Sequence, residues 1–310
     1  MITPMVTLHH FTAPLWFTRD GGWENEKSVE RFARFCEIVG YALGDLMDFV
    51  CTINEANIPI MTTMMREASG PTPEPRIAAA HAAAARACGG DAVKFAPFLT
   101  GNGHAATPNL IAAHRKSFDV LKNAGLTCPI GLTLSLNDFQ AEPGGEQLRD
   151  AADHAINGQF LEACVGDDYV GVQTYTRVRF GTKGVLPPPD SAKRTQMGYE
   201  YYPAALEACI RQAAKATDCP VIVTENGIGT EDDNERIEFT RAALGGVLNC
   251  LRDGVDVRGY IHWSLLDNFE WLEGYEPKFG LVEVDRTTQA RKPKPSAYWL
   301  GGVAKANALD

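Results

Sequence analysis

Two glutamates end apolar runs of the chain in a way that would let their carboxyl groups act on one substrate. Glu55 ends the run CTINE at residues 51–55, and Glu225 ends the run VIVTE at residues 221–225. Cleavage of a glycosidic bond needs two such groups, because one carboxylic acid protonates the leaving oxygen while a second carboxylate attacks the anomeric carbon. A separation of about 5 Å between the two leads to retention through a covalent glycosyl-enzyme.

Each motif alone has a plainer interpretation. Asparagine and glutamate are common where a strand ends or a helix starts, which covers Asn54 and Glu55. Asn226-Gly227 after a β-branched run is also a tight-turn signal. The pair of strand-end glutamates therefore favours catalysis more than either motif does.

Aromatic and polar residues gather in two further segments. Residues 262–271 (HWSLLDNFEW) include Trp263, Glu270 and Trp271. Sugars offer apolar C–H faces and rings of hydroxyls, so aromatic platforms beside carboxylates suit them. The adjacent histidines at the end of residues 4–9 are expected to point to opposite sides, and His10 is a candidate for the side that meets ligand, although a lone histidine is more often a satisfied core residue.

The elements that must position these residues alternate between short apolar runs and longer helical patterns. This order predicts βα units around a parallel sheet. Predicted strands are residues 4–9, 48–52, 129–134, 168–173, 220–224 and 259–263. Predicted helices are residues 29–43, 78–88, 108–123, 145–164, 202–216, 234–253 and 295–303, with loops at 68–75 and 181–191 and an extended excursion at 279–285.

The regular alternation of strand and helix patterns predicts an α/β fold, a (β/α)8 TIM-type barrel. Active sites of such barrels lie at the carboxyl ends of the strands, where Glu55 and Glu225 are expected. Only six of eight βα units are recognisable, and the first begins near Met1. We therefore expect an N-terminally truncated barrel that forms a single domain over residues 1–310.

Composition narrows the class of partner. A formal net charge of -10 and a pI near 5.2 disfavour nucleic acid and anionic membranes as partners. The eight cysteines show no disulfide or metal-binding spacing, and the start of the chain has no secretory pattern, so we expect a cytoplasmic protein. The sequence contains no G-x-G-x-x-G after a strand, no P-loop and no H-E-x-x-H, so neither a cofactor nor a metal is expected.

These motifs together resemble family 1 of the glycoside hydrolases, the β-glucosidases and their relatives, over essentially the whole chain. The TINE and VTENG segments are similar to the family's acid/base and nucleophile motifs, and residues 263–271 with Phe279-Gly280-Leu281 are similar to its sugar-binding stretch. Ala56 and Gln173 depart from the family pattern, which has proline and asparagine there. The family's first two strands would precede Met1, and they carry a glutamine that binds the glycone and an arginine beside the nucleophile.

The resemblance implies a role for each candidate residue. Glu225 would be the nucleophile, Glu55 the general acid/base, and Tyr175 the donor that hydrogen-bonds the nucleophile. Sugar hydroxyls and faces would be held by the remaining candidates, namely Asn54, His10, Glu270, Trp271, Trp263 and Phe279.

The resulting hypothesis is a retaining β-glycosidase that hydrolyses terminal, non-reducing β-D-glucosyl residues of small glucosides or short oligosaccharides. Glu270 would repel a phosphate, which favours an unphosphorylated glycone, glucose first, with galactose or fucose as alternatives. The rival hypothesis is a shortened barrel that retains part of a sugar-binding site and is inactive, or that completes the barrel by association, for which a homo-oligomer is one form.

Overall fold

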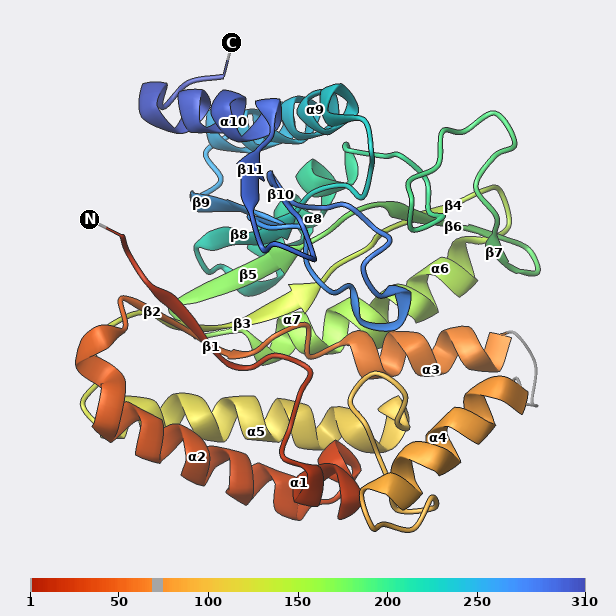
Figure 1. Ribbon diagram of the computed structural model, residues 1–310, viewed down its shortest axis with the longest axis vertical. Coiled ribbons are helices and arrows are strands. Elements are labelled where there is room, and N and C mark those ends of the chain that lie inside the picture. Colours follow the sequence, from red (N-terminus) through yellow and green to blue (C-terminus); the bar gives the residue numbers. More distant parts are fainter. Residues whose placement is uncertain (1, 69–74, 310) are drawn as a thin grey trace. The chain divides into compact units, whose positions relative to one another are not determined.

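The computed structural model describes residues 2–68 and 75–309, so most of the loop predicted at 68–75 lies outside the described residues. The chain divides into two compact units (Figure 1). The first comprises Met1–Ser135 and Ala152–Gly171, and the second comprises Leu136–Ala151 and Val172–Asp310. Each unit is described by itself, and the expected single domain stays a prediction.

The first unit contains parallel strands in the order β1-β2-β3-β5, with β5 shared between the units at Gly171. Val6 pairs with Val50, and Val50 pairs with Ile130, so the strand starts are aligned. Valine and isoleucine favour the half-buried pleated surface of a sheet, which explains why these runs form strands. The strands are β1 (Met5–His9), β2 (Phe49–Ile53), β3 (Ile130–Ser135) and β5 (Tyr169–Gln173).

Two long helices of the first unit, α2 (Lys27–Leu43) and α5 (Gly103–Asn123), lie side by side. The α5 helix begins five residues before the predicted start at 108, because the Asn102 side chain accepts hydrogen bonds from the backbone of His104 and Ala105 and so caps it. The other helices are α1 (Leu15–Arg19), α3 (Ile58–Ala68), α4 (Pro75–Ala87) and α7 (Gln159–Ala163).

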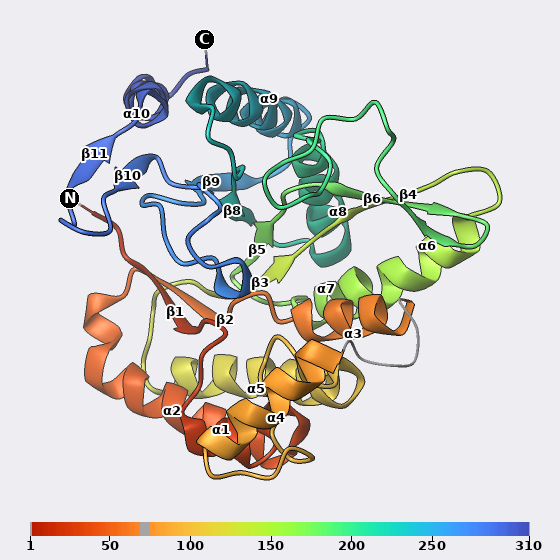
Figure 2. The same ribbon diagram turned by 45° about the vertical axis from the view of Figure 1, so that its right-hand side comes forward.

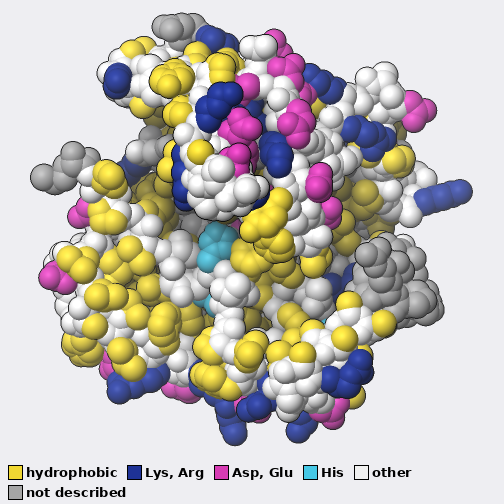
Figure 3. All heavy atoms as spheres, in the orientation of Figure 1, with side chains coloured by type: hydrophobic (Ala, Val, Ile, Leu, Met, Phe, Trp, Pro, Cys, Tyr) yellow, Lys and Arg dark blue, Asp and Glu magenta, His cyan; other side chains and the backbone are white. Residues whose placement is uncertain are grey.

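One face of α2 is buried and another is apolar but exposed. Phe32 and Cys36 are buried, whereas Phe35, Ile38 and Tyr41 are exposed. Figure 3 shows hydrophobic side chains gathered over this helix at the lower left. A helix that is apolar on more than one face is typical of a position between neighbouring elements.

The parallel strands of the second unit run in the order β5-β8-β9, and all six residues of β8 are buried. Helix α8 packs on α9, and α9 packs on α10. These elements are β8 (Val221–Asn226), β9 (Val257–His262), α6 (Glu146–Asp153), α8 (Ala205–Thr217), α9 (Asp233–Arg252) and α10 (Pro295–Ala306).

Two small sheets extend from the second unit (Figure 2). One has the order β4-β6-β7, formed by Asp138–Ala141, Arg177–Gly181 and Gly184–Leu186. The prediction of a plain loop at 181–191 was therefore wrong at its start, because Phe180 and Gly181 pair with Val185 and Gly184. The other is the antiparallel pair β10 (Val282–Val284) and β11 (Arg291–Pro293), and β10 lies within the extended excursion predicted at 279–285.

All six predicted strands are confirmed, with ends that differ by at most two residues. The predicted continuous helix at 145–164 was wrong, because a π-helical turn at His154–Gly158 separates α6 from α7. The α3 helix, which begins directly after the Glu55 segment, was not predicted.

Candidate functional site

The first group of candidate residues lies at the end of β2. Asn54 and Glu55 are buried, with 3% and 7% of their surface exposed. The Asn54 backbone N–H donates to the His9 carbonyl at 2.8 Å, and Ile58 N–H donates to the Glu55 carbonyl at 2.9 Å. Glu55 itself has a φ of 47°, in the left-handed region. The chain thus turns sharply at the glutamate, between the strand and α3.

Thr133 on β3 is an additional residue of this group that sequence reasoning missed. Its hydroxyl oxygen lies 3.4 Å from Asn54 Oδ1 and accepts from the Glu55 N–H at 3.4 Å. The side chain is buried, so these contacts are made in the interior. The sequence could have indicated Thr133 only through its position near the end of the predicted strand that follows the one carrying Asn54 and Glu55.

The adjacent histidines have different surroundings. His10 Nε2 lies 3.3 Å from Asn54 Nδ2, and burial lowers the pKa of His10 below its ordinary value. A neutral ring can accept the amide hydrogen through Nε2. His9 is buried and accepts from Trp23 Nε1 at 3.3 Å, and burial, with the nearby His10, lowers its pKa to about 4. His10 is therefore the histidine that accompanies Asn54.

The second group lies in the second unit, around Glu225 on β8. The Tyr175 hydroxyl donates to Glu225 Oε2 at 2.7 Å, and Glu225 is 8% exposed. The backbone N–H of Thr174 also donates to the Glu225 carbonyl at 3.3 Å. The 2.7 Å length of the bond from the Tyr175 hydroxyl is typical of the strong, charge-assisted hydrogen bonds that carboxylates accept.

The segment after β9 places an aromatic and acidic cluster. Trp263 Nε1 donates to Glu270 Oε1 at 3.2 Å. Burial raises the pKa of Glu270 above its ordinary value, against the opposing effect of hydrogen bonds from Trp263 and Asn268. Trp271 follows with a φ of 48° and opens a 3₁₀ turn. The buried Phe279 ring stands edge-on to Tyr175, with ring centroids 6.0 Å apart.

Two buried ionic contacts hold this segment, and neither was predicted. Lys294 Nζ lies 3.0 Å from Asp267 Oδ1 and donates to the Gly280 carbonyl at 2.7 Å. The Gly280 N–H donates to the same Asp267 oxygen at 2.9 Å, and a Cβ on Gly280 would lie 2.1 Å from Asp267 N. Only glycine fits this close approach.

Arg236 on α9 makes the second contact and is 1% exposed. Its Nη2 donates to the carbonyls of Thr230 and Lys278, each at 2.6 Å, and its Nη1 pairs with Asp233. Asp233 in turn accepts from the N–H and hydroxyl of Ser296, both at 2.7 Å. Arg236 therefore ties the segment between β8 and α9, and the segment after β9, to α9 and to the start of α10.

The structure thus groups the predicted residues within each unit. The first unit groups His10, Asn54 and Glu55. In the second unit, Tyr175 contacts both Glu225 and Phe279. Trp263 is hydrogen-bonded to Glu270, and Trp271 follows Glu270 in the chain. The roles of these residues remain predictions.

Comparison with known proteins decides the family. The sequence profile of glycosyl hydrolase family 1 matches residues 1–187 and 175–309. The chain belongs to glycosyl hydrolase family 1. The family resemblance of the motifs is thereby confirmed, and this family 1 chain is a glycoside hydrolase.

Relatives of the family 1 chain include the β-glucosidase of Agrobacterium sp., which is 32% identical over 98% of this chain and 72% of its own length. The bifunctional β-D-glucosidase/β-D-fucosidase of Bifidobacterium breve is 30% identical over 96% of this chain and 74% of its own length. A β-glycosidase crystal structure matches with a TM-score of 0.90 and 46% identity, over 100% of this chain and 74% of that one. The predicted (β/α)8-type fold is confirmed, with six parallel barrel strands in the described residues.

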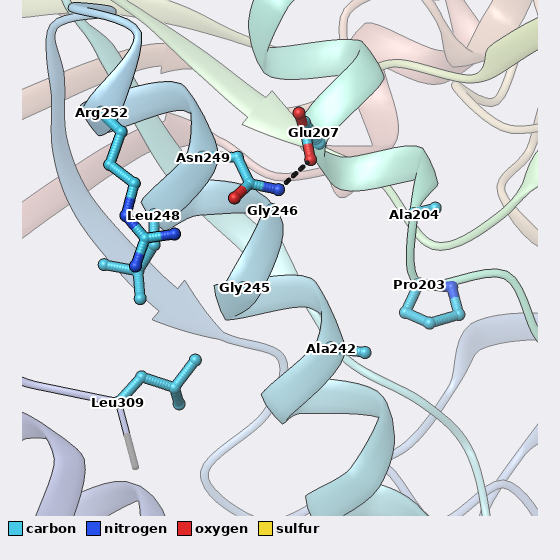
Figure 4. Close-up of a pocket in the computed structure, with 10 residues that line it drawn as sticks. All are labelled: Pro203, Ala204, Glu207, Ala242, Gly245, Gly246, Leu248, Asn249, Arg252 and Leu309. Atoms are coloured by element: carbon cyan, nitrogen blue, oxygen red, sulfur yellow. Dashed lines mark hydrogen bonds between the residues drawn. The ribbon is translucent and has the colours of Figure 1, made fainter.

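Other features of the family 1 chain do not extend the site. In the part of the chain that the structure describes, no three histidine, cysteine, aspartate or glutamate side chains are grouped to hold a metal ion. Within the same residues, every helix is too short or too polar to cross a bilayer. A hollow of about 510 Å³ lies between α8 and α9, where Asn249 donates to Glu207 at 2.9 Å (Figure 4). Its lining includes none of the predicted site residues.

Proposed function

We propose that this family 1 chain is a retaining β-glycosidase that hydrolyses terminal β-D-glucosyl residues, with Glu225 as nucleophile and Glu55 as general acid/base. The observation that carries the proposal is the 2.7 Å hydrogen bond from Tyr175 to Glu225. A nucleophilic carboxylate needs a donor that favours its charged form. In the family pattern, the tyrosine that supplies this bond stands at the position of Tyr175.

The reaction has two displacements. In the first, a Glu225 oxygen bonds to the anomeric carbon while the bond to the aglycone oxygen breaks, and Glu55 gives its proton to that oxygen. In the second, Glu55 takes a proton from water, the water oxygen bonds to the anomeric carbon, and the Glu225 ester bond breaks. Both carboxyl groups return to their starting protonation states, so no cofactor is needed in this scheme.

The remaining candidates would bind the glycone. Asn54 and His10 would hold hydroxyls, as would Glu270 and Trp271, while Trp263 and Phe279 would form the apolar floor. The Trp263–Glu270 hydrogen bond supports this part of the proposal, because it fixes a carboxylate beside an indole ring. Glucose is the proposed glycone, with galactose and fucose to be compared.

The test is hydrolysis of p-nitrophenyl β-glucoside by the purified chain, with Glu225→Gln, Glu55→Gln and, as control, Glu283→Gln on the exposed face of β10. Glu225→Gln should lose activity by at least about a thousandfold, and the control should keep it. Glu55→Gln should be impaired less with nitrophenol as leaving group than with an alkyl alcohol, because a good leaving group needs little protonation.

A slow 2-fluoro-glucoside substrate adds a direct readout. We expect the intact protein to gain the mass of one fluorosugar, located on Glu225 by peptide mapping. Trapping on another residue would refute the assignment of the nucleophile. A folded chain that binds glucose-like inhibitors without turnover would support the alternative of a sugar-binding site that does not hydrolyse.

We propose a cytoplasmic location as well, supported by eight cysteines that are all free thiols, six of them buried. Fractionation of the native host would test it. Light scattering of the purified chain would determine whether it is a homo-oligomer.

A further inference from the structure

Asn226 is a buried side chain beside the proposed nucleophile, and its side-chain nitrogen, side-chain oxygen and backbone carbonyl all form hydrogen bonds. It is 1% exposed. Its Nδ2 donates to the Thr174 carbonyl at 2.7 Å, and its Oδ1 accepts from the Tyr260 hydroxyl at 3.0 Å. Its backbone carbonyl accepts from the Trp263 N–H at 2.9 Å. One asparagine thus links the ends of β5, β8 and β9, which run side by side in Figures 1 and 2.

These links lie directly next to the hydrogen bond that the mechanism uses. Thr174 precedes Tyr175 in the chain, and Asn226 follows Glu225. The Tyr175–Glu225 bond is 2.7 Å long, while hydrogen bonds weaken once the donor and acceptor move a few tenths of an ångström apart. A link between the neighbouring residues of the two strands holds them at the distance at which this bond is short.

We infer that Asn226 and Tyr260 are positioning residues that hold the Tyr175 hydroxyl against the Glu225 carboxylate. The inference rests on the proposed function and adds two residues to it. Neither side chain reaches the reacting atoms in this scheme. They act through the strand ends that carry Tyr175 and Glu225.

The surroundings of Tyr260 suit a fixed donor. Burial raises the pKa of its hydroxyl well above the ordinary value. His262 Nδ1 lies 3.5 Å from the same hydroxyl, and burial lowers the pKa of His262 to about 4, with Arg236 adding to the effect. Both groups are therefore neutral across the working pH range, and the donor stays in place.

The test compares wild type with Tyr260→Phe and Asn226→Ser in the full chain. Each variant should lower kcat for p-nitrophenyl β-glucoside by about five- to tenfold, as for the loss of one buried hydrogen bond, with little change in KM. The acid limb of the kcat/KM profile should move to higher pH, in the same direction as in Tyr175→Phe. The control is Tyr201→Phe, which removes a hydroxyl from a ring packed on Phe239 and should change none of these values.

A second measurement does not need turnover. Carbon-13 NMR of labelled glutamate, with the Glu225 signal assigned through Glu225→Gln, follows the titration of this carboxyl in each folded variant. A titration at higher pH in Tyr260→Phe than in wild type supports the inference even if the chain hydrolyses no glycoside, in which case the proposed function fails alone. Titration and acid limb unchanged in both variants, with reduced thermal stability only, would show a merely structural role and overturn the inference.

Discussion

Replacing Arg236 by methionine should destabilise the second unit strongly. Methionine keeps most of the apolar stem but removes the guanidinium, which makes the contacts to Thr230, Lys278 and Asp233. The side chain is 1% exposed, so water cannot replace the lost donors without rearrangement. Arg236→Met therefore measures how much one buried guanidinium contributes to the free energy of unfolding.

The magnitude follows from what each partner loses. The carbonyls of Thr230 and Lys278 would each lose a charged donor at 2.6 Å, which costs about 1–3 kcal/mol per buried acceptor. Asp233 would lose its ion pair but keep both hydrogen bonds from Ser296, so its carboxylate stays hydrogen-bonded and adds only a small further cost. We expect a loss of about 3–5 kcal/mol in the free energy of unfolding, near the range for breaking a buried ion pair.

Thermal unfolding followed by circular dichroism measures the effect. For a chain of this size, 1 kcal/mol shifts Tm by roughly 2–4 °C, so Tm should fall by about 6–20 °C. The control is Arg258→Met, which breaks a pair with Asp256 whose side chains are 56% and 54% exposed, and it should shift Tm by only a few degrees. Equal shifts in the two variants would refute the reasoning from burial.

Three further results are expected. His9 has a pKa of about 4 in the folded chain and 6.5 in the unfolded chain, so the unfolded state binds the proton first and stability should fall as the pH drops from about 6.5 towards 4. In urea titrations at several pH values, His9→Gln should flatten this dependence of stability on pH. An unchanged dependence in the variant would contradict the prediction. Thr133→Val should lower kcat/KM about five- to tenfold, because valine cannot form the hydrogen bonds of the Thr133 hydroxyl with Asn54 and Glu55. The control Thr127→Val, at an exposed position, should leave kcat/KM unchanged. Equal activity of the two variants would exclude this role of Thr133. The 6-phosphorylated aryl β-glucoside should be cleaved at least about a hundredfold less efficiently than the glucoside, because Glu270 repels the phosphate. The ratio of the two efficiencies should grow as Glu270 ionises with rising pH and should shrink in Glu270→Gln. A ratio that does not depend on pH would count against charge repulsion.

The parallel strands and the strand-end residues could be predicted from the sequence because the signals are local. Residues 221–224 (VIVT) form an unbroken buried β-branched run, and a residue directly after such a run must lie at the carboxyl edge of the sheet. The motif around Glu55 is local in the same sense. The positions of both glutamates at strand ends could therefore be predicted without any knowledge of their partners.

The remaining features depend on residues far apart in the chain. Strand β4 pairs with β6 in parallel, so Phe139 meets Val178 only after the intervening chain has folded. Thr133 and Asn226 matter through partners on other strands, and no short pattern indicates such contacts. Arg236 in an otherwise amphipathic helix looks like a surface charge until its burial is known.

The left-handed backbone at Glu55 also bears on how this chain can change by mutation. A side chain at φ 47° costs the fold about 1–2 kcal/mol that glycine does not, and asparagine tolerates the same region well. Replacement of Glu55 by glycine or asparagine would therefore relieve backbone strain and remove the carboxyl group. Glu225, within a regular strand, offers no comparable gain. Under the proposed mechanism, the activity of the chain requires the glutamate at position 55 despite its cost to stability.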